Sequence, residues 1–481
     1  MISRGEEMKH IKYSVLLVLI LSSLINAQNG GGISASSDPV STAMGKTYTV
    51  TARGVYALGI NPALISWSEE KSFEFTVIGP INIRAGFDFM TLDDYNYFFG
   101  GQTNSTTGKK EGKYLSLDDE KRFRSLFADE SKFIGTTSFA LFAATYNMGK
   151  KAGTIGFSIS DIVFSRAIIP ETFAKIALEG DTPGEIYDFS NLDIKAIWSR
   201  KYSLSYARDF NLFNWKKVSA GISLNLMHGY GYAATDYIRT NFTIGSGNVL
   251  TGTGDYRAIS AFSPDFGVQY EFDSTHIDKG KNFFPFPTPA GTGFGVDLGF
   301  AAQINDKWSF GVALTDLGSI KWTQKTAEFK AEGPIYLDDI LDQKQRDSLT
   351  NLLKGKAQPT GEFSTSLPGA LRFGLAFTTS GSSGAWLFAS DLNFGFNNEP
   401  GNSTKPRWSM GMEWNPKASW LPWFRTGFST GGSDIPSWSF GGGFKIWKIY
   451  FDGATSDFQY LFSPSKAKRV SVSLGARWRF D

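Results

Sequence analysis

The sequence predicts an all-β protein, namely a transmembrane antiparallel β-barrel of about 14–16 strands with an N-terminal luminal hatch. Apolar and polar side chains alternate with period two over most of residues 290–481. After residue 27 no apolar run is long enough for a membrane helix, and short and long connections between the expected strands alternate. Composition agrees, because 52 of the 481 residues are glycine and aromatic residues reach 15%, against an average glycine content of about 7%.

Residues 1–27 have the features of a secretory signal peptide. Lys9 and Lys12 precede the apolar run SVLLVLILSSLI, and Ala27 stands at the expected cleavage position. An acidic pair near the start leaves both Met1 and Met8 as candidate initiators. We expect residues 28–70 to form an N-terminal segment with the hatch, and residues 71–481 to form the barrel with long external loops.

Charge and cysteine content exclude several partners and cofactors. The signal peptide carries three of the 48 basic and two of the 46 acidic side chains, which leaves 45 basic and 44 acidic residues in the mature chain. Such a balance gives no reason to expect nucleic acid as a partner. The chain has no cysteine, which excludes disulfides, thiolate metal sites and a lipidated cysteine. The expected location is the bacterial outer membrane, with its lipid as a partner.

The register of the expected strands determines which charges face the lumen. If the bulky apolar residues face lipid, the polar residues that point inward are Asp297, Arg372, Asp391, Glu413, Arg425 and Lys445, together with Arg477 and Arg479. A one-residue slip would turn all of them towards lipid, at about 2–4 kcal/mol for each arginine or lysine at the midplane. A soluble β-sandwich also alternates, but tryptophans gather near strand ends, as in interfacial girdles: 308, 322, 386, 408, 414, 438, 447 and 478.

Residues 52–67, ARGVYALGINPALISW, match no ordinary element. Gly54, Gly59 and Pro62 would break a helix or a central strand, yet the stretch is rich in apolar side chains. An irregular backbone at membrane depth is tolerated inside a barrel, where it avoids lipid. We therefore expect residues 45–67 to lie in the lumen, with Asn61 bonded to the wall and Pro62 holding a turn.

The motif Asn61-Pro62-Ala63 resembles the hatch signature of FadL-like outer-membrane proteins, the long-chain fatty-acid transporter family. The strand pair GFGVDLGFAAQINDKWSFGVALTDLGSIKW, residues 293–322, is similar to that family as well. The resemblance covers residues 45–481 and implies a hatch that moves to let an apolar ligand diffuse through. Only Asn61, Pro62 and Ala63 match position by position. The chain departs from the family in ending on Asp481 rather than on the preceding aromatic residue.

Two functions are compatible with these features. The first is transport of small hydrophobic molecules, such as fatty acids, past the N-terminal hatch. The alternative is a non-transporting barrel that scaffolds surface or protein-secretion partners. Three phenylalanines in the loop FFPFPTP, namely Phe283, Phe284 and Phe286, are the tentative ligand-binding residues, because exposed apolar loop residues need a use.

An enzyme is not expected. Only His228 and His276 remain after signal removal, and His228 is in phase with the apolar residues Ile222, Leu224 and Leu226 on the expected lipid side. The sequence contains no phosphate loop, metal-spaced cluster or nucleophile elbow, so no cofactor and no metal are predicted. Helices are expected in the external segments 116–130, 170–180 and 337–355, the first with a capping box from Ser116 to Asp119.

Overall fold

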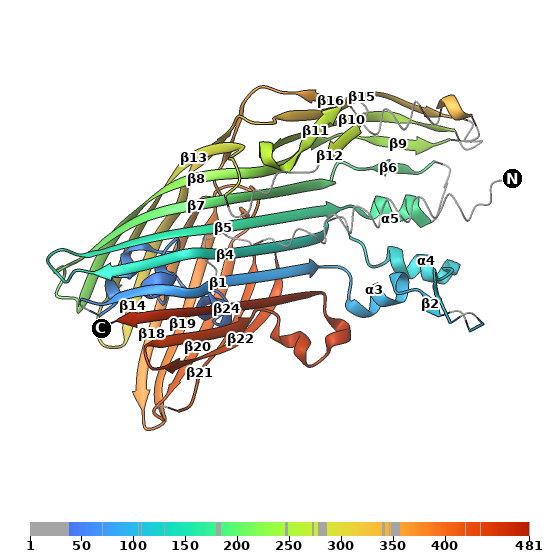
Figure 1. Ribbon diagram of the computed structural model, residues 1–481. Helices are drawn as coiled ribbons and strands as arrows, with labels where there is room; N and C mark the ends of the chain where they lie inside the picture. The colour runs from blue at the N-terminus through green and yellow to red at the C-terminus, as the bar shows by residue number, and fades with distance from the viewer. Residues whose placement is uncertain are drawn as a thin grey trace.

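The computed structural model describes residues 38–480 except positions 70, 104, 107, 129, 179–183, 246–248, 272–273, 278–285, 339–341, 346, 348–355, 419 and 433. Within this part of the chain, 14 strands close into one antiparallel barrel (Figure 1), within the expected range of 14–16. Its strands are β1 Phe73–Phe87, β4 Ser131–Asn147, β5 Thr154–Ile169, β7 Asp193–Phe210, β8 Lys217–Ile238, β13 Gly291–Gln303, β14 Trp308–Trp322, β18 Ala370–Gly381, β19 Gly384–Gly395, β20 Arg407–Pro416, β21 Trp423–Gly431, β22 Asp434–Ile446, β23 Ile449–Thr455 and β24 Arg469–Phe480. Pairing of β1 with both β24 and β4 closes the ring.

One side of the barrel continues outward as a sheet. The upper part of β8 leaves β13 and pairs with β10 (Leu250–Phe262), which pairs in turn with β15 (Ala327–Leu337). The extension also contains β6 Ile186–Asp188, β9 Asn241–Ile244, β16 Lys356–Pro359 and β17 Phe363–Ser366. In Figure 1 these strands lie beyond the barrel at the end opposite the C-terminus.

The connections at that end carry the helices. They are α3 Leu92–Phe99, α4 Leu117–Arg124 and α5 Glu171–Leu178, with the small hairpins β2 Gln102–Thr103 with β3 Lys110–Glu111, and β11 Val268–Glu271 with β12 Ser274–Ile277. Ser116 is the N-cap of helix α4 and forms the expected capping box with Asp119, and α5 falls in the second expected helical segment. Much of the third, 337–355, lies outside the described residues. Connections at the C-terminal end are short, such as residues 304–307 between β13 and β14.

The two faces of the wall differ as a bilayer requires. Large apolar side chains cover the outside and are 45–59% exposed, among them Leu204, Leu224, Phe294, Leu375, Met410 and Leu474. Polar side chains on the inside are buried, including Asp297, Arg372 and Asp391 at 0% exposure. A closed barrel with an apolar outer belt and a polar interior is the outer-membrane architecture, so this protein resides in the bacterial outer membrane.

Among the described residues, no helix is long and apolar enough to cross a membrane.

Trp322 corrects one expectation. By sequence phase it belongs with Trp308 in an interfacial girdle, but it is fully buried and its Nε1 donates to Thr365 Oγ1 at 2.9 Å. The reason is an extra residue in β14 opposite Asp297, where Asp316 adopts φ 56°. This bulge inverts the alternation above it, so Trp322 turns inward.

The observed register predicts which positions contact lipid. Nitroxide labels on single cysteines at Leu375 and Met412 should collide with dissolved oxygen as lipid-facing labels do, because both side chains lie on the apolar outer face. A label at Tyr114, 86% exposed in an external loop, should contact water instead. The chain has no native thiol to interfere. If a water-soluble relaxant reached the labels at Leu375 and Met412 as readily as it reaches the label at Tyr114, this register would be contradicted.

Candidate functional site: the lumen and its N-terminal segment

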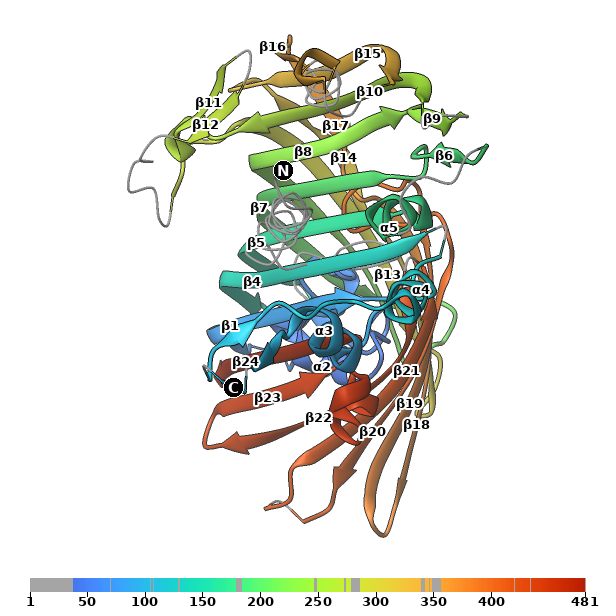
Figure 2. The ribbon, with the colours of Figure 1, turned by 90° about the vertical axis from the view of Figure 1, so that its right-hand side faces the viewer.

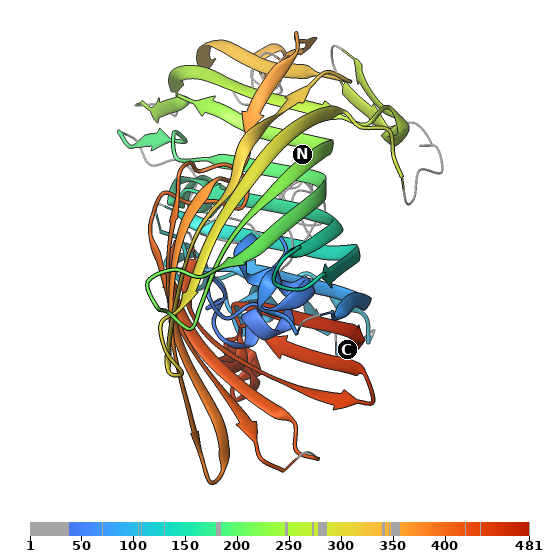
Figure 3. The ribbon, with the colours of Figure 1, turned by 90° about the vertical axis from the view of Figure 1, so that its left-hand side faces the viewer.

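Residues 38–67, here called the luminal segment, lie inside the barrel (Figures 2 and 3). The segment consists of α2 Pro39–Ala43, then η1 Gly54–Ala57 and η2 Pro62–Trp67, joined by irregular chain. Helix α2 packs against β22 and β23, whereas η2 packs against β7, β8 and β13. The segment therefore bridges opposite parts of the wall, and most of its residues are buried.

The core of the luminal segment is apolar. Its buried members are Tyr48, Ala52, Val55, Tyr56, Ala57, Leu58, Ile60, Ala63, Leu64 and Ile65, and the wall contributes Ala143, Ala207 and Ala301. Small wall residues let the segment approach closely. This explains why a stretch that is too apolar for solvent can be stable outside a helix or a strand: the barrel encloses it.

Glycines on the inner wall make room for the Asn61-Pro62 turn. A β-carbon on Gly299 would lie 2.1 Å from Asn61 Oδ1, and one on Gly221 would lie 2.5 Å from the carbonyl carbon of Pro62. Both distances are shorter than real contacts, so only glycine fits. Other wall glycines that approach the segment in the same way are Gly156, Gly311, Gly374, Gly411, Gly427 and Gly441.

Hydrogen bonds satisfy the irregular backbone of the segment. Asp391 Oδ2 accepts from the amides of Tyr48 and Thr49 at 2.9 and 2.8 Å. Asn61 Nδ2 donates to the Thr49 carbonyl at 2.8 Å and to the wall carbonyl of Phe300 at 3.2 Å, while Asn61 Oδ1 accepts from Ala63 N at 3.1 Å. Asn61 thus joins two parts of the segment to β13.

The phenol of Tyr48 connects the segment to two wall arginines. Its hydroxyl oxygen accepts from Arg372 Nη1 and, at 3.0 Å, from Arg407 Nη2. Arg372 also lies over the Tyr48 ring, with its guanidinium carbon 5.2 Å from the ring centroid. All three side chains are buried, so removal of the phenol would leave two arginines with fewer partners.

Salt bridges fill the lumen near the C-terminal end of the barrel. Arg425 pairs with Glu413 at 2.5 Å and with Asp452 at 2.8 Å. Glu74 accepts from Arg477 at 3.4 Å and from Arg479 at 3.0 Å. Lys445, at the end of β22, is exposed, and its ammonium lies 5.0 Å from the centroid of the Tyr450 ring.

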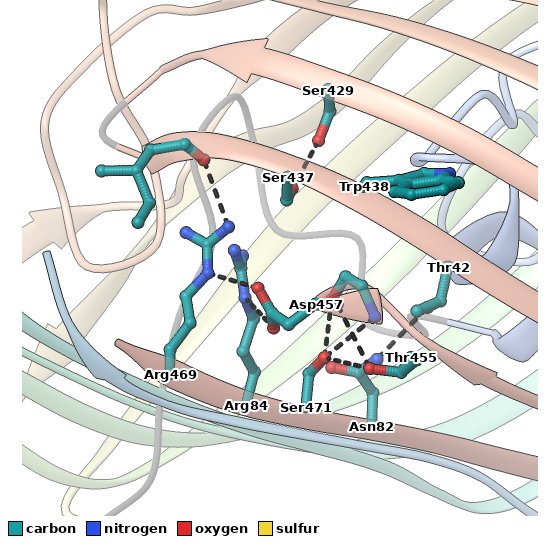
Figure 4. A network of polar contacts seen from close by, with 12 residues as sticks. Thr42, Asn82, Arg84, Ser429, Ser437, Trp438, Thr455, Asp457, Arg469 and Ser471 are labelled. Carbon is teal, nitrogen blue, oxygen red and sulfur yellow. Dashed lines mark hydrogen bonds and ion pairs between the residues drawn. The ribbon is translucent and has the colours of Figure 1, made fainter. Parts of the chain in front are cut away.

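A second polar network lies towards the loop end (Figure 4). Arg84 and Arg469 both contact Asp457, Arg84 at 3.4 Å, and all three are nearly inaccessible to solvent. On the same strand as Arg84, Asn82 Nδ2 donates to Thr42 Oγ1 of the luminal segment at 3.2 Å. The network therefore lies beside a contact that fixes α2 to β1.

Two further features lie near the middle and the loop end of the lumen. Lys201 Nζ pairs with Asp316 at 2.7 Å and with Asp297 at 3.4 Å. Nearer the loops, Trp322 lies 5.3 Å from Tyr232 and 6.3 Å from Phe363, between ring centroids. This aromatic cluster also contains Met227, Ala234, Ala261, Ala290, Ile320 and Leu367.

The wall is interrupted between β1 and β4. Their pairing stops at Phe75 with Ala144 and resumes at Ile81 with Phe139, so residues 76–80 of β1 have no strand partner on β4. Pro80, which has no amide hydrogen, lies in this gap, and the Thr76 hydroxyl accepts from Ala143 N at 3.0 Å.

A small cavity lies behind the gap. Its volume is about 10 Å³, and it is lined by Val55, Leu58, Pro80, Ala140, Ala143 and Lys201, among others. The outer side of the same gap carries apolar residues that are 38–53% exposed, namely Val77 (45%), Ile78, Leu141 and Phe142 (41%). At the gap, therefore, a cavity lined by the luminal segment lies on one side of the wall and exposed apolar side chains lie on the other.

The residues expected from sequence are placed as follows. Asp297, Arg372, Asp391, Glu413 and Arg425 point into the lumen, each with an ion pair or hydrogen bond there. Phe286 is 68% exposed on the outside of the wall, whereas Phe283 and Phe284 lie outside the described residues. Sequence analysis included Tyr48 in the luminal residues 45–67 but assigned it no wall contact. It did not identify Lys201, Arg407 or Asp452 as luminal, although these three alternate in phase with inward residues.

The family model that matches residues 62–445 is described as a family of unknown function, DUF5723. The chain belongs to the DUF5723 family. No curated protein matches its sequence.

Solved structures with a similar chain course include outer-membrane transporters. The toluene transporter TbuX of Ralstonia pickettii is 13% identical, with 93% of this chain and 99% of TbuX covered at a TM-score of 0.44. The toluene transporter TodX of Pseudomonas putida is 11% identical, with 94% of this chain and 98% of TodX covered at a TM-score of 0.42. A Pseudomonas aeruginosa FadL homologue is 10% identical, with 95% and 99% covered at 0.43.

The glycine at 299 gives a direct test of the close packing. Gly299→Val should destabilise the seated segment by about 1–3 kcal/mol, because the added carbons overlap Asn61 and Pro62. The measurement is protease sensitivity of residues 38–67 in the folded, detergent-solubilised barrel. Gly381→Val is the matched control, since a β-carbon there meets nothing within 4 Å. Equal protection of the segment in both variants would contradict the packing described.

Proposed function

We propose that this protein carries small hydrophobic molecules across the outer membrane, with the luminal segment as a movable hatch. The observation that carries the proposal is the interruption of β1–β4 pairing in front of a cavity lined by the luminal segment. A regular wall would have continuous backbone hydrogen bonds at this level. Here five residues of β1 have no pairing partner on β4, and the apolar side chains of Val77, Ile78 and Phe142 border the opening on the lipid side.

The proposed route has an entry, a barrier and an exit. At entry, a ligand contacts the aromatic cluster of Tyr232, Trp322 and Phe363 near the loops. The barrier is the luminal segment, which fills the lumen below that cluster. For exit, a shift of Val55 and Leu58 would enlarge the cavity behind Pro80, and an apolar ligand would leave between β1 and β4 into the bilayer.

The chemistry of the route favours uncharged or mostly apolar ligands. The segment packs on the wall mainly through alanine and other aliphatic side chains, which offer no hydrogen bond to a polar solute. Lys201, Ser158 and Ser160 also line the cavity, but the lipid-side border of the gap is formed by Val77, Ile78 and Phe142. At that border an ion would have to lose its hydration without compensation, whereas an alkyl chain or an aromatic ring would not. Small hydrophobic molecules are also what TbuX and TodX are named for.

A cross-link over the gap tests the route. Cysteines at Pro80 and Ala140, both of which line the cavity, should when joined by a short bis-maleimide reduce uptake of radiolabelled oleate and toluene towards the level of host cells without the protein. The physical reason is that the two strands can no longer separate.

The matched control joins cysteines at Ile83 and Thr137, which are paired partners in the regular part of β1 and β4. This link should leave uptake unchanged. Full uptake through the 80–140 link would exclude the lateral exit. If cells with the parent protein take up neither oleate nor toluene, the proposed transport function itself is wrong.

The second candidate, a scaffold for surface or secretion partners, has its support in the external extension. Strands β10 and β15 continue the wall beyond the barrel, and side chains such as Tyr336 and Ile186, 55% and 68% exposed, lie on that extension. A scaffold needs no gap in β1–β4, so the uptake measurement distinguishes the two functions.

A further inference from the structure

The outer wall carries a buried ion pair where lipid-facing residues are expected. Asp161 of β5 is paired in register with Arg200 of β7, and Arg200 with His228 of β8. Their neighbours two positions away, Ile159 and Leu226, belong to the outward apolar set, and Leu226 is 49% exposed. Paired residues share a face of a sheet, so this ion pair points away from the lumen.

The ion pair has close geometry. Arg200 Nε and Nη2 donate to Asp161 Oδ1 and Oδ2 at 2.5 and 2.9 Å, and Trp198 Nε1 donates to Oδ2 at 3.2 Å. Both charged side chains are only 1% exposed. A charge on the outer wall stays out of contact with lipid only if other groups cover it.

The cover comes from the connection between β10 and β13. We call residues 263–267 and 286–290 the strap. The centroid of the Phe286 ring lies 5.2 Å from the Arg200 guanidinium carbon, and that of the Tyr230 ring lies 5.3 Å from it. Phe266 stacks on Trp198, with centroids 5.5 Å apart and planes at 11°. The strap therefore shields the ion pair from outside the barrel.

Hydrogen bonds fix the strap where the wall divides. Its two arms bond to β8 at Gly229 and Tyr230, through Ala290 N and Ser263 N, both at 2.7 Å. Thr288 N also donates to Asp265 Oδ2 at 2.7 Å, which joins the arms. In Figures 2 and 3 the β11–β12 hairpin, which follows the first arm, projects away from the barrel wall.

The strap lies at the height of the outer membrane boundary. From Val218 at the C-terminal end of the barrel to His228, β8 advances ten residues. At about 3.3 Å per residue and a tilt of about 40°, this corresponds to a rise of about 25 Å, the height of the apolar band of such barrels. Residues at this level are Tyr202, whose ring is 5.0 Å from His228, and Phe286, 68% exposed.

We propose that the strap is a membrane-contacting element that rests in the headgroup layer of the outer leaflet. Tyr202 and His228 face the lipid headgroups, as amphipathic rings do at membrane boundaries, and the exposed Phe286 ring lies at the same level. The strap keeps the Asp161–Arg200 pair out of contact with acyl chains. This role is independent of transport, because the strap lies on the outside of the wall.

A depth measurement tests the position of the strap. A nitroxide at Phe286→Cys in the full-length protein, reconstituted in phosphatidylethanolamine–phosphatidylglycerol vesicles, is compared with labels at Leu224→Cys on the lipid face and Tyr114→Cys in an external loop. The ratio of oxygen to nickel-chelate accessibility at position 286 should fall between those of the two controls. A value equal to that of the Tyr114 label, or as deep as that of Leu224, overturns the proposal.

A double-mutant cycle tests the shielding role. Replacement of Phe266 and Phe286 by serine should lower the unfolding midpoint of the folded band in heated gel samples by several degrees. In an Asp161→Leu, Arg200→Leu background no charge needs cover, so the same serine changes should lower it little. An equal loss in both backgrounds would show that the strap does not shield the pair.

Discussion

Every backbone amide and carbonyl of a chain within a bilayer must find a partner inside the protein, and the rest of this structure depends on how that constraint is met. Fourteen strands meet it by closing β1 against both β4 and β24. Closure on this scale leaves a lumen that wall side chains cannot fill. The luminal segment fills it, and its irregular backbone is in turn satisfied by Asp391, Asn61 and the Phe300 carbonyl. Glycines such as Gly221 and Gly299 allow that approach.

The places where the wall departs from regular pairing are the places with distinct chemistry. At residues 76–80 of β1, lost pairing brings a luminal cavity close to the lipid face. At the bulge of Asp316, an extra residue turns Trp322 into the aromatic cluster and places Asp316 beside Lys201. At Tyr230, β8 changes partner from β13 to β10, and the strap leaves the wall. Each irregularity costs ladder hydrogen bonds, and each is compensated locally by side chains.

The sequence predicts the barrel, its register and most of its inner polar residues, because period-two alternation and the energetic cost of charges in lipid determine them together. Asn61, Pro62 and their neighbours could be assigned to the lumen for the same reason, since no other environment suits an apolar, irregular stretch. Trp322 was misassigned because a one-residue bulge in β14 is invisible to alternation. Sequence analysis did not identify Asp161 as an outward charge, although it is in phase with the outward residues Ile155, Phe157 and Ile159. Only the strap, which is distant in sequence, makes an outward charge tolerable there. The β1–β4 gap is a break in the pairing of two strands, and alternation along one strand does not show how it pairs with the next.

The central claim is that the luminal segment is seated by wall contacts and must move for a ligand to pass. Locking it in place tests this claim most directly. Ser66 Oγ donates to Asp209 Oδ1 at 2.7 Å, so cysteines at 66 and 209 lie within the span of a short bis-methanethiosulfonate cross-linker, which would join η2 to β7 in an otherwise cysteine-free chain. Cross-linked Ser66→Cys, Asp209→Cys protein in proteoliposomes should pass radiolabelled oleate and toluene no faster than empty vesicles, and reductive cleavage of the link should restore the rate of the single-cysteine variants. Equal passage through the cross-linked and the cleaved double variant would contradict the account, since the segment would then not need to move.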